Sequence, residues 1–203
     1  MTGRTPHARD YAWLRERHAG LRDAYCITLA GAIGPQELLA AVGAGPGTRI
    51  TGVAGLFEPS FDCWERAAGA ELFVGVAALG DWAVMVEVNG YLGVSSPAIR
   101  TVSAGRTVVS HYYADAMDRF LWLADGELLL RFEPLHPSRR EGSGADRFLV
   151  EMRESGFRLD PDQELDLQGA EAAFALAERI TGVRLTAELL DSLEFVGAVA
   201  PVP

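Results

Sequence analysis

Two pairs of apolar segments, each joined by a two-residue turn, most constrain what this chain can fold into. The first pair is ELFVGVAAL and WAVMVEVNG, joined at Gly80-Asp81, and the second is DRFLWLA and ELLLRFEP, joined at Asp125-Gly126. Because glycine and aspartate tolerate the positive φ angles of tight hairpin turns, an Asp-Gly pair between apolar runs is a strong hairpin signal. The two hairpins predict an antiparallel sheet in the middle of the chain.

The segments around the hairpins predict further strands and a set of helices. AYCITLAG and RTVVSHYY have the apolar, β-branched composition of strands, whereas GPQELLAAVG and SSPAIRTVSAG have the early proline and closing glycine of short helices. After the polar loop PLHPSRREGSG, the segments ADRFLVEMRESG, QGAEAAFALAERITG and VRLTAELLDSL have helical periodicity. We therefore expect an α+β fold with helices packed on one face of the sheet and a helical C-terminal third. The sheet is expected to be largely antiparallel, with a mixed sheet as the alternative, and to have about five to seven strands.

Length and composition favour one domain with a short N-terminal extension. The chain has 203 residues, 49% of them hydrophobic, which is enough to build a core. We expect residues 1–9 to be a flexible tail and residues 10–203 to be a single α+β domain. No signal-type segment and no apolar run of about 18 residues occurs, so a cytoplasmic protein without membrane association is expected.

The charge of the chain indicates which partners suit it. The formal net charge is −10, and all 18 basic residues are arginines because lysine is absent. Nucleic acids and anionic membranes would be repelled by such a surface, whereas a basic protein would be attracted. The absence of lysine, together with many alanines and glycines, is typical of the coding bias of high-GC bacteria. The oligomeric state is left open.

Three segments occur together in a pattern found in a known family. They are the strand WAVMVEVNGYLG, the step Ser-x-Gly-x-x-Val in SAGRTVVSHYY, and the close ALAERITGVRLTAELLD. From about Tyr11 to about Ala200, the chain resembles a family of uncharacterised proteins, labelled as a domain of unknown function, that is common in high-GC Gram-positive bacteria. The resemblance implies a single-domain bacterial protein. It assigns no site residue, because the family has no established activity or catalytic residues.

Polar residues of interest follow one another where the strand WAVMVEVNG ends. Glu87 and Asn89 share one face of a strand whose other residues are nearly all apolar. Glu87 therefore lies either on a solvent face or in a semi-buried place with a raised pKa, which would mark a functional carboxyl group. Asn89-Gly90 is interpreted as a strand exit, and Ser96 as the N-cap of the next helix, whose backbone amides can hold an anion.

His111 is the most chemically suggestive side chain. Asp115 and Asp118 follow it closely in VVSHYYADAMD, so it could be oriented by a carboxylate and act as a general base or as one metal ligand. The alternative is a half-buried strand histidine satisfied by a hydrogen bond, with the aspartates in turn and cap positions. Tyr112 and Tyr113 are adjacent, so one of them must face away from the core, where it would suit a protein interface.

Neither a metal site nor a cofactor site is expected. Cys26 and Cys63 are too few for a disulfide framework or a metal quartet, and a metal needs more ligands than one convincing histidine. The glycines at 43, 45 and 47 follow a predicted helix and lack the Gly-Lys-Ser/Thr sequence of a phosphate loop.

Two hypotheses about function result. The first is a non-enzymatic, acidic protein-binding domain of the adaptor or immunity type, whose partner is another protein and, by charge, a basic one. The alternative is a small-molecule-binding protein or enzyme that uses the sheet surface around Glu87, Asn89, His111 and Asp115. The alternative requires these four side chains to converge, so their placement in the structure distinguishes the two hypotheses.

Overall fold

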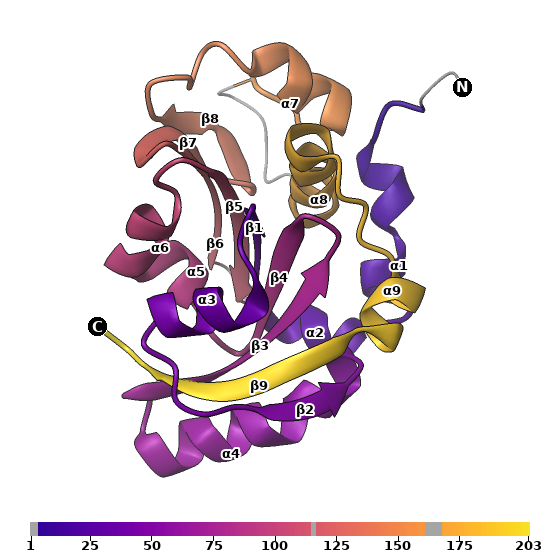
Figure 1. Cartoon of the computed structure of the whole chain (residues 1–203). Helices are drawn as coiled ribbons and strands as arrows, with labels where there is room; N and C mark the ends of the chain where they lie inside the picture. The colour runs from indigo at the N-terminus through magenta and orange to yellow at the C-terminus, as the bar shows by residue number, and fades with distance from the viewer. Residues whose placement is uncertain (1–3, 115–116, 161–167) are drawn as a thin grey trace.

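Within residues 4–114, 117–160 and 168–203, which the computed structural model describes, nine strands form one antiparallel sheet (Figure 1). The strand order across the sheet is β2-β9-β3-β4-β1-β5-β6-β7-β8. The strands are β1 (Ala24–Gly31), β2 (Thr48–Thr51), β3 (Glu71–Leu79), β4 (Trp82–Val88), β5 (Thr107–Ala114), β6 (Met117–Ala124), β7 (Glu127–Glu133), β8 (His136–Glu141) and β9 (Glu194–Pro201). Both predicted hairpins are present, as β3-β4 and β6-β7. Every neighbouring pair runs antiparallel, which confirms the expected sheet type.

The expected number of strands is wrong, and the expected helical C-terminal third is not confirmed, because β8 and β9 lie there beside α7, α8 and α9. The polar segment predicted as a loop forms β8, which is an edge strand and therefore needs no apolar alternation. The last residues of the chain form β9, which lies between β2 and β3. β9 contains Gly197, which has no side chain and so interrupts the alternation of the strand. A side chain would not fit at this position, because a Cβ atom would lie 2.5 Å from the ring of Phe73. Neither strand has the alternation that identifies a strand from sequence.

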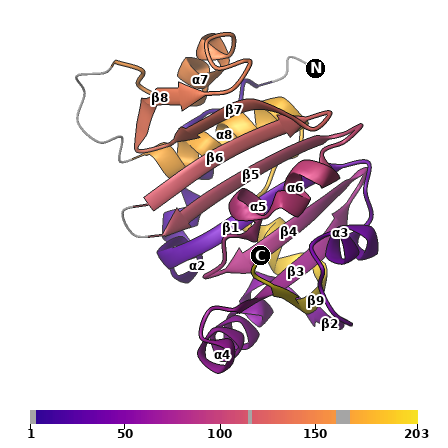
Figure 2. The ribbon, with the colours of Figure 1, turned by 90° about the vertical axis from the view of Figure 1, so that its left-hand side faces the viewer.

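Helices cover both faces of the sheet, so the expectation of helices on one face is also wrong (Figure 2). We call the face that carries Ile27 and His111 the α8 face, and the face that carries Cys26 and Glu87 the α5 face. Short helices α3 (Pro35–Ala41), α5 (Leu92–Ser95) and α6 (Pro97–Val102) lie on the α5 face. The remaining helical elements pack around the α8 face and the ends of the sheet: η1 (Ala8–Tyr11), α1 (Trp13–Glu16), α2 (Ala19–Asp23), η2 (Val53–Leu56), α4 (Phe57–Ala67), α7 (Leu149–Ser155), α8 (Gly169–Thr181) and α9 (Ala187–Ser192).

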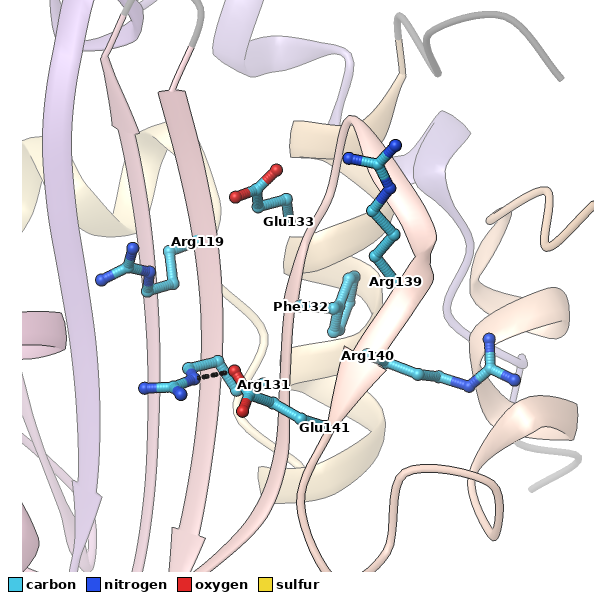
Figure 3. A pocket seen from close by; sticks show the side chains of 7 residues that line it. All are labelled: Arg119, Arg131, Phe132, Glu133, Arg139, Arg140 and Glu141. Atoms are coloured by element: carbon cyan, nitrogen blue, oxygen red, sulfur yellow. Dashed lines mark hydrogen bonds and ion pairs between the residues drawn. The ribbon is translucent and has the colours of Figure 1, made fainter. Parts of the chain in front are cut away.

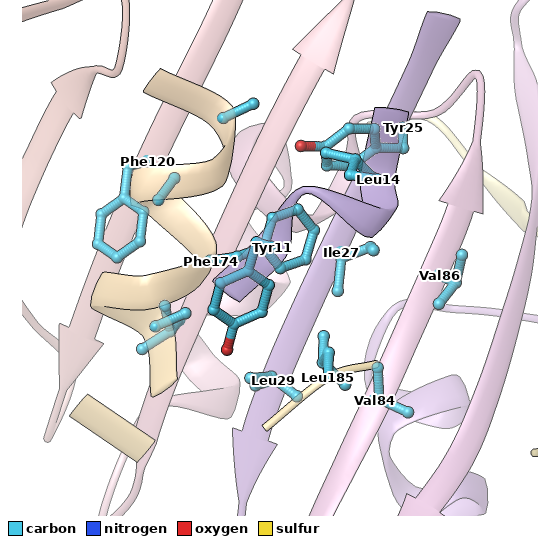
Figure 4. Close-up of a cluster of buried hydrophobic side chains, with 14 of the residues drawn as sticks. Tyr11, Leu14, Tyr25, Ile27, Leu29, Val84, Val86, Phe120, Phe174 and Leu185 are labelled. Atoms are coloured by element: carbon cyan, nitrogen blue, oxygen red, sulfur yellow. The ribbon is translucent and has the colours of Figure 1, made fainter. Parts of the chain in front are cut away.

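The core of the α8 face is built around the ring of Phe174 in α8 (Figure 4). The ring centroid of Phe174 lies 5.5 Å from that of Tyr11, 5.9 Å from that of Tyr25 and 5.7 Å from that of His111. Tyr11 belongs to η1, which packs against the side of α8 that faces away from the sheet. η1 begins at Ala8, which is buried and lies inside the stretch that was expected to be a tail. No helix in the described ranges has the length and apolar character needed to cross a lipid bilayer.

Candidate functional site

Glu87 lies at the end of β4 and is fully buried beneath α5. Its Oε2 accepts a hydrogen bond from the Leu92 amide at 2.7 Å, and its Oε1 accepts one from the Gly93 amide at 2.9 Å. The chain can return over its own strand because Asn89 has a φ of +55°. Burial raises the pKa of Glu87 to about 7, although the two amide hydrogen bonds oppose this shift. Of the two environments considered for Glu87, the structure shows the buried one.

Side chains of β1 and β5 lie beneath α5 together with Glu87. The hydroxyl groups of Thr28 and Ser110 are 2.9 Å apart. Gly93 rests directly on this layer, because a Cβ atom there would lie 2.1 Å from Thr28 Oγ1 and 2.8 Å from Cys26 Sγ. Burial raises the pKa of the Cys26 thiol well above its ordinary value, and Glu87 adds to this shift. The Glu87 carboxyl therefore holds α5 on the sheet and has no exposed surface for a ligand.

Ser96 is the N-cap of α6, as predicted, so its hydroxyl group is already occupied by a hydrogen bond within the protein. Its hydroxyl oxygen accepts a hydrogen bond from the Ala98 amide at 3.2 Å, and Pro97 is the first residue of the helix. The helix that directly follows Asn89 is α5, which the sequence analysis did not predict and which Glu87 caps in place of a serine. Asn89 is half-buried, and its amide donates a hydrogen bond to the Ala24 carbonyl at 3.0 Å, so it turns the chain.

His111 lies on the α8 face and is enclosed by α8. Its Nδ1 is 3.0 Å from the Tyr25 hydroxyl oxygen, and its Nε2 has no hydrogen-bond partner among the described residues. Burial lowers the pKa of His111 to about 3, so the imidazole is neutral at physiological pH. The structure therefore shows the alternative considered for His111, a strand histidine held by one hydrogen bond. The side chain is more buried than that alternative expected, since only 3% of its surface is exposed.

The two aspartates near His111 do not orient it in the described part of the chain. Asp115 lies outside the described residues. Asp118 is buried at the start of β6, and its Oδ2 accepts a hydrogen bond from the Leu135 amide at 2.9 Å. Burial raises the pKa of Asp118 to about 7, and the nearby Glu133 adds to the shift. Asp118 therefore holds the chain where β7 leads into β8.

Glu87 and His111 point to opposite faces of the sheet. Glu87 pairs with Cys26, whereas His111 pairs with Ile27, and neighbouring residues of β1 alternate between the faces. The hypothesis that Glu87 and His111 share one site is therefore wrong.

The adjacent tyrosines are divided in the same way. Tyr112 lies on the α5 face, opposite Cys26, and Tyr113 lies on the α8 face, where its ring stacks on Tyr25 at 6.0 Å. Both side chains are half-buried. Since helices cover both faces, neither tyrosine is left fully exposed beside His111.

A groove of about 470 Å³ lies over β6, β7 and β8. It lies where β8 moves away from β7, at an irregularity of the pairing next to Phe132 and Glu133. Figure 3 shows Arg119 and Arg139 on its two sides, with Glu133 between them in this view. We call it the arginine groove, lined by Arg119, Arg131, Phe132, Glu133, Arg139, Arg140 and Glu141.

The arginines of the groove differ in how they are paired. The Nε of Arg131 lies 2.6 Å from Glu141 Oε1, and the Nη2 of Arg140 lies 3.0 Å from Asp146 Oδ1. Arg119 and Arg139 are exposed and form no hydrogen bond or ion pair with any residue in the described ranges. The hydrogen bond from Arg131 lowers the pKa of Glu141, and the charge of Arg119 contributes to this shift. Two guanidinium groups are therefore available to an anion.

A second cavity, of about 270 Å³, adjoins the arginine groove on the α5 face. It shares Arg119 and Glu133 with the groove, so these two residues border both spaces. We call it the aromatic cavity, lined by Tyr91, Val94, Ser95, Tyr112, Met117, Asp118, Arg119 and Glu133. Tyr112 is the predicted site residue that contributes to it directly, and Glu87 contributes indirectly by holding α5.

The arginine groove depends on a strand pairing that the local sequence does not indicate. The dipeptide Arg-Phe occurs in both strands of the second hairpin, and Phe120 pairs with Phe132 in the structure. Because side chains alternate along a strand, Arg119 and Arg131 then share the opposite face. Among the described residues, no three His, Cys, Asp or Glu side chains are grouped so that they could hold a metal ion.

Comparisons with known proteins identify a family. Comparison with curated proteins and with solved structures found no match. The chain does match the model of a family of unknown function, DUF6461, over residues 4–203, which is nearly its whole length. The resemblance seen in the sequence to a family of unknown function is thereby confirmed. The protein belongs to the DUF6461 family.

Proposed function

We propose that this protein is a binding domain that holds an anionic group in the arginine groove. The observation that carries the proposal is the gathering of Arg119, Arg131 and Arg139 in one groove of a chain with a net charge of −10, whereas the Arg140 side chain points away toward Asp146 (Figure 3). Three cations on one surface repel one another unless anions compensate their charge, and Glu133 and Glu141 supply only two carboxylates. Glu141 and Asp146 already pair with Arg131 and Arg140, so Arg119 and Arg139 are the arginines that a ligand would neutralise.

The chemistry of the groove favours a phosphate or carboxylate group. A guanidinium group offers its N–H donors in a planar fork that matches two oxygens of either group. Phe132 borders the groove from β7, but its ring packs on the α8 face against Phe120 and Phe157. The groove therefore offers its guanidinium donors as the groups that would recognise an anion.

Isothermal titration calorimetry with inorganic phosphate and pyrophosphate at low ionic strength tests the proposal. The double substitution Arg119→Ala, Arg139→Ala is expected to weaken binding by about tenfold or more, since it removes both available guanidinium groups. The matched control is Arg49→Ala, Arg100→Ala, which removes the same charge from exposed positions on β2 and α6 outside the groove. Equal affinity in the two double variants would mean that net charge alone attracts the anion, and the proposal would be wrong.

A second candidate function is binding of a basic protein through α4. Phe61 and Trp64 on this helix are 49% and 37% exposed. The exposed carboxylates of Glu58, Asp62 and Glu65 surround these rings. Aromatic rings flanked by carboxylates complement a cationic segment, through both ion pairs and cation–π contacts. This surface supports the proposal of a protein-binding domain that attracts a basic partner.

Titration with an arginine-rich peptide tests the second candidate. We expect the peptide to bind the wild type and to bind Phe61→Ser, Trp64→Ser about tenfold more weakly. Val150→Ser is the control, because Val150 is 59% exposed on α7 and lies outside α4. If the peptide binds the double variant as well as the wild type, α4 is not its site.

We also propose a high-GC bacterial origin and a cytoplasmic location. The exclusive use of arginine among 18 basic residues supports the first. Cys26 and Cys63 are both unpaired and buried, which suits a reducing compartment and supports the second. Cell fractionation in the native host tests the location.

A further inference from the structure

The geometry points to one small molecule that occupies the arginine groove and the aromatic cavity together: a flat heteroaromatic ring joined to a phosphate or carboxylate group. This inference rests on the proposed anion binding and adds the identity of the rest of the ligand. The two spaces share Arg119 and Glu133, so a ligand whose anionic group reaches Arg119 has the aromatic cavity directly beside it.

The walls of the aromatic cavity are suited to a ring. Tyr91 precedes α5, Val94 lies on α5, and Tyr112 comes from β5, so the cavity lies between a helix and the sheet. Met117 lines the same cavity and is 65% exposed, more than any other large apolar side chain in the described ranges. A thioether adapts its shape to a neighbouring ring, and a bound ring would remove this apolar surface from water.

The volume sets the size of the ring system. A cavity of about 150 Å³ in a protein core is large enough to take up benzene. The aromatic cavity, at about 270 Å³, therefore has room for one or two fused rings but not for a folded peptide segment. This favours a small molecule over a macromolecular partner at this site.

The polar lining selects a ring that donates hydrogen bonds. Glu133, which is exposed, and Tyr112 line the cavity and can offer a carboxylate and a hydroxyl group. Asp118 also borders it, but it pairs with Tyr113 of the α8 face and its Oδ2 accepts a hydrogen bond from the Leu135 amide. Carboxylate oxygens accept hydrogen bonds, so a ring that carries N–H groups fits this lining better than a hydrocarbon ring.

The helix wall is held in place before any ligand binds. Glu87 accepts hydrogen bonds from the amides of Leu92 and Gly93, and these residues lie between Tyr91 and Val94 in the sequence. Glu87 is thus a positioning residue for the cavity, since it fixes the helix and does not contact the space itself. A wall that is already ordered reduces the entropy lost on binding.

Calorimetric titration with two matched pairs of probes tests the inference. The first pair is inorganic phosphate and adenosine 5′-monophosphate, and the second is acetate and indole-3-acetate, so each pair compares an anion with and without a ring. We expect the ring-bearing member of at least one pair to bind about tenfold more tightly than its ring-free counterpart. The pair that shows the gain tells whether phosphate or carboxylate is the natural anionic group.

Substitutions separate the two halves of the site. Met117→Ala and Tyr91→Ala should each reduce the gain from the ring and leave the affinity for inorganic phosphate unchanged. Val150→Ala is the control for Met117→Ala, because it shortens another exposed apolar side chain far from this lining. The double substitution Arg119→Ala, Arg139→Ala should weaken all four probes.

Each contrary outcome has its own meaning. If phosphate binds at the groove but no ring-bearing probe binds more tightly, the further inference is wrong and the proposed function stands. If no probe binds at all, both are wrong. If a ring-bearing probe binds tightly and neither Met117→Ala nor Tyr91→Ala affects it, the ring lies elsewhere and the inference is again wrong.

Discussion

The two faces of the sheet each enclose an ionisable side chain, and they differ in what lies beyond it. On the α8 face, His111 is covered by Phe174 and the rest of α8, and its nearest polar partner is the buried Tyr25. On the α5 face, Glu87 is covered by a helix of only four residues, and the aromatic cavity lies beside it, between that helix and the sheet. A long helix closes one face, whereas a short helix leaves room for a cavity on the other.

This difference shows that a chemically suggestive residue type does not by itself indicate a site. His111 and Glu87 are both almost fully buried, so neither can meet a ligand. The residues that can do so are the exposed arginines at the open end of the α5 face. Substitutions of His111, Glu87, Gly93 and Arg119 test the contrast between the closed α8 face and the partly open α5 face.

The largest expected effect concerns the pH dependence conferred by His111. Burial lowers its folded-state pKa from 6.5 to about 3, so its contribution to stability is present above pH 6.5 and is lost as the pH falls toward 3. Over that range the contribution amounts to about 5 kcal/mol in the free energy of unfolding. His111→Phe should remove this acid dependence, as measured by urea unfolding between pH 7 and pH 3.

The loss of the Tyr25 hydrogen bond in His111→Phe lowers stability at every pH alike, so the slope against pH is the quantity to compare. His136→Phe is the matched control, because His136 lies half-buried in the edge strand β8 and is not enclosed by a helix. An acid dependence in His111→Phe equal to that of the wild type would show that the α8 face is not closed.

Glu87 should produce a pH dependence of opposite sign. Burial raises its folded-state pKa from 4.5 to about 7, so its contribution is full below pH 4.5 and is lost as the pH rises toward 7. The change is about 3 kcal/mol. Glu87→Gln should reduce the fall in unfolding free energy over this range by that amount and leave the part due to Asp118, whose pKa burial also raises to about 7, whereas Glu133→Gln, at an exposed position on β7, should retain the whole fall. A fall in Glu87→Gln as large as that of the wild type would contradict the burial of this carboxyl group.

Gly93→Ala tests how closely α5 rests on the sheet. The added Cβ atom would overlap Thr28 Oγ1 and Cys26 Sγ, which belong to the rigid strand β1. Overpacking of this kind costs about 2 kcal/mol. Gly45→Ala is the control, since its nearest neighbour would be the Val199 carbonyl oxygen at 3.9 Å. Thermal unfolding measures both, and equal stability of the two variants would show that α5 can move away from the sheet.

The central part of the fold could be predicted from the sequence because its signals are local. The Asp125-Gly126 turn, the Gly80-Asp81 turn and the Ser96 N-cap each depend on residues a few positions apart, and all three are present. By contrast, β8 and β9 are defined by pairing with distant strands, and their own composition is polar or interrupted by glycine. Pairing of that kind leaves little trace in a local pattern.

Burial of polar groups could be predicted even less well. A helical wheel of α8 places Glu171 away from the apolar stripe, but Glu171 is 1% exposed and pairs with Arg15 of α1. The cause is that η1 and α1 cover the outer side of α8, so this helix has no solvent face along most of its length. A helical wheel assumes one buried side and therefore fails for a helix packed on two.

The candidate site was missed because it depends on a register shift. A two-residue turn at Asp125-Gly126 with a regular ladder would place Phe120 and Arg131 on the same face. The irregularity between Trp122 and Leu123 shifts the pairing by one residue, so that Phe120 lies opposite Phe132. A shift of one residue exchanges the faces of a strand. It brings Arg131 to the side of Arg119 and so creates the arginine groove.

The smallest expected effect on stability is that of the groove itself. Arg119 and Arg139 are exposed and have no described partner, so Arg119→Ala and Arg139→Ala should each change the free energy of unfolding by no more than about 0.5 kcal/mol. Arg140→Ala should cost more, because its guanidinium group also donates to the carbonyl of Ala145 and pairs with Asp146. Urea unfolding of the three variants measures the difference. A large loss of stability in Arg119→Ala would mean that this arginine supports the fold, and the open end of the α5 face would then be as structural as the closed α8 face.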